Sequence, residues 1–186
     1  MTRETEVGET RNARAGGFVG RGFVAATLLL VATAVVWWPV LRSGPITDDH
    51  HFLKIAHDLV RMDEDRGAAR LGDWFAIWGA GADEGAARGH RFYRPVVLQS
   101  HALQLWWTGL ASRPLMIGNL LIHLAGTLGV FLLARRAAGL RWRAAALVGA
   151  LFATSPLAVE PVAWICDRSD TLSLAFGVWA LVWSYG

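Results

Sequence analysis

Four uncharged, mostly apolar stretches alternate with polar segments along the chain, at residues 23–41, 115–134, 144–159 and 171–186. A helix of about twenty apolar residues crosses the roughly 30 Å hydrocarbon core of a bilayer. The first stretch lies between two arginines and carries Trp-Trp-Pro near its end, so we interpret it as a signal anchor. A cleavable signal peptide has a shorter apolar core. The pattern predicts an all-α, polytopic membrane protein with about four transmembrane helices.

Interfacial helices are expected in the long loop 42–114, because residues 42–94 hold nine acids and eight bases and cannot cross a membrane. Residues 52–60 have apolar side chains at the i, i+3, i+4 spacing of a helix that lies against a membrane or a protein face. Residues 95–111 are uncharged, but four of their polar side chains share one helical face. These are Ser100, His101, Gln104 and Thr108. We expect this helix to lie in the interface or to line a polar cavity.

The second and third apolar stretches each carry a pattern that predicts packing against protein. Asn119, His123 and Thr127 follow one another at four-residue intervals, and such a polar stripe faces protein or water rather than lipid. The third stretch has small residues at positions 145, 149 and 153, which allow close helix packing. Pro156 is expected to end or kink this helix.

The orientation follows from the short connection between the second and third stretches, which has four arginines and no acid. These are Arg135, Arg136, Arg141 and Arg143. Such a loop stays in the cytoplasm, and so does the N-terminus, with residues 1–22 as a flexible cytoplasmic tail. Loop 42–114 and residues 160–170 are then extracytoplasmic, provided that 95–111 does not cross. The Ala-, Gly- and Arg-rich composition is typical of a GC-rich bacterium, which predicts the inner membrane.

Composition excludes several classes of protein. The chain is 54% hydrophobic but 18% charged, so its apolar residues must be segregated into blocks rather than spread over a soluble core. The arginines are scattered and accompany no soluble recognition motif, which excludes nucleic-acid binding. Cys166 is the only cysteine, so no internal disulfide can form.

Two acidic groups are predicted on the extracytoplasmic side: the pair Asp48 and Asp49, and the set formed by Glu160, Asp167 and Asp170. A carboxylate there could accept a proton from a hydroxyl or hold a divalent metal ion, while an arginine neutralises a departing phosphate. The pair could equally cap a helix. With the two histidines that follow it could also bind a metal, but adjacent side chains on a helix diverge, so no metal ligand is assigned.

These residues, taken in order, resemble the N-terminal part of membrane glycosyltransferases of the GT-C class. The matching segments are Asp48-Asp49, Tyr93-Arg94-Pro95, residues 119–123, and Glu160 with Trp164, Arg168 and Asp170. The nearest likeness is to protein O-mannosyltransferase-like proteins that often carry tetratricopeptide repeats. It covers roughly residues 46–186, within an expected N-terminal GT-C-like membrane domain at 23–186.

The resemblance implies an enzyme that moves a mannose-like sugar from a polyprenyl-phosphate carrier to a hydroxyl acceptor, often a protein Ser or Thr, outside the cytoplasm. Asp48 or Asp49 would then be the catalytic base. Arg94 and Arg168 would bind the phosphate, and Glu160 and Asp170 would position the acceptor or the sugar. No cofactor is implied with certainty, although a divalent metal could assist.

The chain departs from the family in two places. Ser155-Pro156-Leu157-Ala158 stands where the family has His-Pro-x-His, and Cys166-Asp167 replaces small residues before Arg168. The later spans of a GT-C domain are absent, so we expect the front part of an enzyme whose C-terminal part is a partner. The alternative is a non-enzymatic membrane scaffold or a protein that binds a lipid-linked sugar. A transporter would need charges at mid-membrane, whereas here they lie at the ends of the spans.

Overall fold

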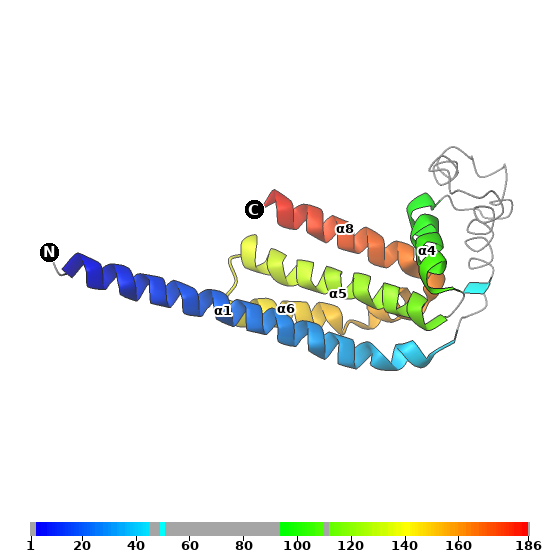
Figure 1. Ribbon diagram of the computed structural model, residues 1–186, viewed down its shortest axis with the longest axis horizontal. Coiled ribbons are helices and arrows are strands. Elements are labelled where there is room, and N and C mark those ends of the chain that lie inside the picture. Colours follow the sequence, from blue (N-terminus) through cyan, green and yellow to red (C-terminus); the bar gives the residue numbers. More distant parts are fainter. Residues whose placement is uncertain (1–2, 45–48, 51–93, 110–111, 186) are drawn as a thin grey trace. The chain divides into compact units, whose positions relative to one another are not determined.

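The computed structural model describes residues 3–44, 49–50, 94–109 and 112–185, and this part of the chain is helical without any β-strand. The predicted all-α class is therefore confirmed. The α-helices in Figure 1 are α1 (Arg3–Trp37), α4 (Pro95–Thr108), α5 (Ser112–Arg136), α6 (Trp142–Ala153), α7 (Val159–Ala163) and α8 (Arg168–Ser184). Three short 3-10 helices connect them: η1 (Trp38–Arg42), η2 (Pro156–Ala158) and η3 (Ile165–Asp167). The helix predicted at 52–60 lies outside the described residues.

Two stretches of helix are long and apolar enough to cross a membrane, at Gly20–Arg42 and Arg113–Arg136. A third span results if Trp142–Ala153 and Pro156–Ala163, which are separated by a short break, together form one bent span. The fourth predicted span is helical as α8, with 17 residues, and is not among these candidate spans. The structure thus supports a membrane protein with two such helices, or three.

The start of α1 differs from the sequence-based expectation, whereas the end of α6 agrees with it, and both have local causes. The segment predicted as a flexible tail is helical, because α1 begins at Arg3 and continues without a break into the apolar stretch. Its arginine, glutamate and alanine residues are good helix formers, which compensates for its glycines. Helix α6 ends at Ala153, as predicted, because Pro156 has no N–H to donate and its ring excludes the preceding turn.

The described helices contribute to two compact units. Unit 1 comprises Met1–Val36, Leu124–Ser155 and Ala175–Gly186, and unit 2 comprises Trp37–His123 and Pro156–Leu174. Several helices pass from one unit into the other, and each unit has its own apolar core. We therefore describe the units separately.

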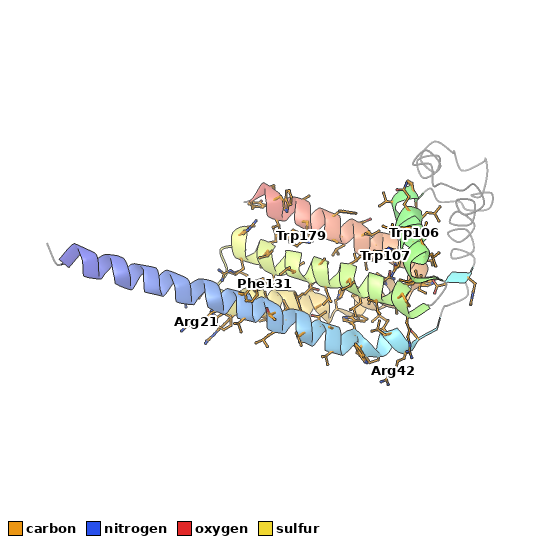
Figure 2. All side chains as sticks on the ribbon, viewed as in Figure 1. Arg21, Arg42, Trp106, Trp107, Phe131 and Trp179 are labelled. Carbon is orange, nitrogen blue, oxygen red and sulfur yellow. The ribbon has the colours of Figure 1, made fainter. Side chains whose placement is uncertain are left out.

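The core of unit 1 is built on the small residues of α6. Ala145 and Ala153 are fully buried, Gly149 is buried between them, and an apolar cluster joins Ala145 to Leu29 of α1 and Phe131 of α5. The predicted packing role of these small residues is confirmed. Figure 2 labels Phe131 among the helices of this unit.

Helix α8 is fixed to α5 within unit 1 by a polar contact. The indole Nε1 of Trp179 donates to the carbonyl of Ala125 at 3.0 Å, and Arg136 Nη1 donates to the carbonyl of Val182 at 3.2 Å. Both donors lie on side chains and reach the backbone of the other helix. The two contacts hold α8 along α5.

The core of unit 2 places α4 against the start of α5. Leu105, Leu115, Met116 and Ile165 form its buried apolar cluster, with Leu98 packed against it. The opposite side of α4 is exposed and aromatic: Trp106 is 58% and Trp107 83% exposed, and Figure 2 labels both side chains.

Gly149 provides a test of the packing in unit 1. A Cβ atom at this position would lie 2.6 Å from Leu29 Cδ2, so Gly149→Ala is expected to reduce the free energy of unfolding by about 1–3 kcal/mol. At Gly177, in α8, a Cβ would meet nothing within 4 Å. Gly177→Ala should therefore be neutral or stabilising by about 0.5–1 kcal/mol, the helix propensity of alanine over glycine. Thermal unfolding in detergent micelles measures both, and equal effects of the two variants would contradict the close packing.

Candidate functional site

The guanidinium of Arg168 is the best connected polar group of unit 2. Arg168 begins α8 and is 2% exposed. Its Nε donates to Asn119 Oδ1 at 2.7 Å, its Nη2 donates to Gln104 Oε1 at 2.7 Å and to the Leu115 carbonyl at 2.9 Å, and its Nη1 donates to Ser100 Oγ at 3.4 Å. We call these five residues the Arg168 cluster. It ties α4 and α5 to the first turn of α8.

Helix geometry explains how α4 and α5 reach the guanidinium. Ser100 and Gln104 are four residues apart and therefore lie on the same face of α4. Gly118, on α5, leaves the necessary room, because a Cβ there would lie 2.5 Å from Gln104 Oε1 and 2.8 Å from Arg168 Nη2. Gln104 Nε2 also donates to the carbonyl of Pro114, which fixes the amide with its oxygen toward Arg168. The predicted polar face of α4 thus lines a buried polar cluster, although the outward Thr108 bonds only within its own helix.

The polar stripe of α5 faces protein, as predicted. Asn119 is fully buried, and its Nδ2 donates to the carbonyl of Trp164 at 3.0 Å while its Oδ1 accepts from Arg168. His123 is buried with its ring 5.5 Å from that of Trp37 in an edge-on contact. The amide of Asn119 thereby links α5 to the connection between α7 and η3.

His101 lies fully buried on α4 near the positive charge of Arg168. Burial lowers the pKa of its imidazole well below 6.5, and the charge of Arg168 lowers it further. The imidazole is therefore neutral at pH 7. Burial also lowers the pKa of Arg168, to about 10, so the guanidinium remains charged at that pH.

A hydrogen bond of Asp49 joins the first predicted extracytoplasmic loop, 42–114, to the second, 160–170. Its side chain is fully buried, and its Oδ1 accepts the backbone N–H of Cys166 at 2.8 Å although 117 positions separate the two residues. Asp49 therefore lies against the segment just before Arg168. Asp48 lies outside the described residues.

Three other described acids of unit 2 and one arginine form a group of exposed or half-buried charges. Glu160 and Asp170 are exposed, Asp167 is half-buried, and Arg94 is exposed just before α4. Burial raises the pKa of the Asp167 carboxyl, the negative charges of Asp170 and Glu160 raise it further, and Arg94 lowers it. Asp170, Glu160 and Arg94 therefore each lie within electrostatic reach of Asp167. We call the three acids Glu160, Asp167 and Asp170, together with Arg94, the acidic group.

The predicted site residues thus fall into two sets. Arg168 is buried in a cluster of neutral partners, whereas Arg94, Glu160 and Asp170 belong to the acidic group. Sequence reasoning missed the partners Gln104, Asn119 and Leu115 of the guanidinium, and it gave Asp167 no role. The polar face of α4 and the stripe of α5 were the available signals, but nothing in the sequence indicated that both meet at Arg168. Among the described residues, no three potential metal ligands of the His, Cys, Asp or Glu type gather around a common point.

Asp167 gives unit 2 a pH-dependent stability. Its pKa is raised above 3.8 in the folded state, so the folded chain binds this proton more tightly than the unfolded chain. The contribution of Asp167 to stability is therefore most favourable below pH 3.8 and is lost as the pH rises through the raised pKa. Asp167→Asn, which does not titrate, should raise the melting temperature relative to the unmodified chain at about pH 7 and have less effect at about pH 3. Thermal unfolding across this pH range measures the difference, and a difference independent of pH would refute the assignment.

The arrangement of unit 2 suits the recognition of a molecule with both an anionic and a hydroxyl group. A buried cation at Arg168 can stabilise negative charge, and the carboxylates of the acidic group can accept hydrogen bonds from hydroxyls or take a proton. The buried Asp49 holds the segment that carries both sets. Compared with protein family models, curated proteins and solved structures, the chain matches none of them.

Proposed function

We propose that the chain is part of a membrane glycosyltransferase of the GT-C class, resembling the N-terminal part of protein O-mannosyltransferase-like enzymes. It transfers a mannose-like sugar from a polyprenyl-phosphate carrier to a hydroxyl acceptor, such as a protein Ser or Thr or a glycan, on the extracytoplasmic side. The observation that carries the proposal is the hydrogen bond from Cys166 N–H to Asp49 Oδ1, because it unites the acid of one loop with the Arg168 segment of another.

The proposed chemistry needs a base and a cation. Asp48 or Asp49 removes the proton from the acceptor hydroxyl, whose oxygen attacks the anomeric carbon of the sugar. The bond from that carbon to the phosphate oxygen breaks, and the phosphate leaves with the bonding electrons. Arg94 and Arg168 counter the charge of the phosphate, while Glu160 and Asp170 position the acceptor or the sugar.

The topology proposed for the enzyme has four spans, near 23–41, 115–134, 144–159 and 171–186, in the inner membrane of a bacterium. The N-terminus is cytoplasmic. The arginines at both ends of the connection between α5 and α6 support this orientation, because short loops rich in arginine stay in the cytoplasm. The donor lipid, the acceptor, the bilayer and the C-terminal remainder of the enzyme are then its partners.

The burial of Asp49 and Arg168 favours the non-enzymatic alternative. Asp49 is fully buried and Arg168 is 2% exposed, so both could act only to hold unit 2 together. The chain would then be a membrane scaffold, or would bind a lipid-linked sugar without transferring it.

Single and double substitutions in the full-length protein separate these possibilities. Asp49→Asn keeps an oxygen that can accept the Cys166 N–H, so the fold should persist while a catalytic base is lost. We expect Asp48→Asn or Asp49→Asn to reduce transfer from a labelled polyprenyl-phosphate sugar by roughly 10²- to 10⁴-fold, the usual contribution of a general base. Membrane vesicles with the labelled donor provide the assay.

Glu9→Gln is the matched control, because it removes a carboxylate from the N-terminal segment and should leave transfer unchanged. An unchanged rate in the double variant Asp48→Asn, Asp49→Asn would exclude both as the base. No transfer by the unmodified full-length protein, with the lipid still bound, would favour the non-enzymatic alternative.

A further inference from the structure

The positive charge of Arg168 is balanced by no carboxylate in the described part of the chain. Its four acceptors are an amide oxygen of Gln104, an amide oxygen of Asn119, a hydroxyl of Ser100 and the backbone carbonyl of Leu115. All four are neutral.

Two of the described acids of unit 2 interact with other groups. Asp49 accepts from the backbone of Cys166, and the cation that influences the carboxyl of Asp167 is Arg94. Burial alone accounts for the lowered pKa of Arg168, with no contribution from a neighbouring carboxylate.

Burying the guanidinium of Arg168 among neutral acceptors costs free energy. A buried charge loses several kcal/mol of hydration, and buried arginines are usually paired with an acid. The position adds to this cost, because Arg168 opens α8 and the N-terminal end of a helix carries a partial positive charge. An anion bound beside the guanidinium would offset both terms.

The guanidinium retains hydrogen-bonding capacity for such an anion. An arginine has five N–H groups, and four hydrogen bonds engage Arg168 within the described residues. The weakest of them is the 3.4 Å contact from Nη1 to Ser100 Oγ, and the hydroxyl of Ser100 is itself donated to the carbonyl of Val97. An anionic oxygen could replace Ser100 at Nη1 without disturbing the three shorter bonds.

A second donor of the same region also lacks an acceptor. The indole Nε1 of Trp164 is buried with no hydrogen-bond partner in the described part of the chain. The carbonyl of this same residue accepts from Asn119, which in turn holds Arg168. One N–H of Arg168 Nη1 and the indole N–H of Trp164 thus remain for the oxygens of a ligand. Asn119 is hydrogen-bonded to both residues.

We propose, on the basis of the function proposed above, that Gln104 and Asn119 position the guanidinium of Arg168, which that function assigns to the donor phosphate, and determine its preference for an anionic ligand. Their amide oxygens hold the guanidinium in place and leave its charge uncompensated. A carboxylate at either position would accept from the same N–H of Arg168 and neutralise its charge, although it would lose the amide donor to the Pro114 or Trp164 carbonyl. Gln104 and Asn119 are therefore positioning residues whose neutrality matters.

The test uses two substitutions that place a carboxylate beside Arg168, Gln104→Glu and Asn119→Asp, in the full chain in lipid nanodiscs. Each also removes an amide donor, which serves the Pro114 carbonyl at Gln104 and the Trp164 carbonyl at Asn119. The charge-assisted hydrogen bond to Arg168 should offset this loss, and thermal unfolding shows that each variant is folded before its binding is compared. Each should also weaken binding of a polyprenyl phosphate at least about tenfold, the expected effect of losing one strong interaction with the anion. Asn12→Asp, in the N-terminal segment, is the control with the same chemical change and should leave both quantities unaltered.

Three probes identify the ligand group: a polyprenyl phosphate, the corresponding polyprenol and inorganic phosphate. Preference for the polyprenyl phosphate over the polyprenol, lost in both variants, supports the proposal. Binding of inorganic phosphate by the unmodified chain but by neither variant also supports it, and shows that the lipid tail is not required. Equal binding of phosphate and alcohol, or undiminished binding by stable variants, would overturn it.

Binding is measured without transfer, so the two proposals can fail separately. A chain that binds the phosphate but moves no sugar retains the anion site and loses the proposed enzyme. A chain that transfers sugar with full affinity in both variants retains the enzyme and loses the role of Gln104 and Asn119. If one variant does not fold, the other still decides, because they lie on different helices.

Discussion

A guanidinium that has left water must donate its N–H groups to oxygen atoms, because an unsatisfied buried charge costs several kcal/mol. In unit 2 this requirement determines how the helices meet. Arg168 takes acceptors from α4 and α5 at the first turn of α8, and Asn119 extends the network to the carbonyl of Trp164. The apolar cluster around Leu105 and Leu115 supplies buried area, but apolar contacts have no direction. The register of α4 against α5 therefore depends on the polar contacts, which tolerate little displacement.

The two units use opposite means of packing. In unit 1, small residues let α6 approach α1 and α5, and the contact is nearly all apolar, as at Gly149 against Leu29. Close packing of this kind is effective in a lipid environment, where burial of apolar surface adds little driving force between helices. Unit 2 instead buries Asp49, Arg168, Asn119 and His101, whose groups need specific partners. The two units are therefore held together by different kinds of contact.

The charges of unit 2 are separated by burial. The cation at Arg168 is enclosed among neutral oxygens, whereas Glu160 and Asp170 are exposed beside the half-buried Asp167. Between them, the backbone N–H of Cys166 binds Asp49, so the short segment 166–170 carries an anchor, an acid and the buried cation in succession.

The sequence by itself determined the helical class, the two longest apolar helices, the end of α6 before Pro156, and the inward direction of Asn119, because these depend on local periodicity and on residue chemistry. It also pointed to Asp49 and Arg168 as residues of interest. It did not indicate that the N-terminal segment continues α1, since helix propensity there competes with glycine content. Only the tertiary structure decided that Arg168 has neutral partners and that Asp49 binds Cys166. Those contacts join residues 49 to 117 positions apart, and no local pattern specifies which distant oxygen a buried donor will reach.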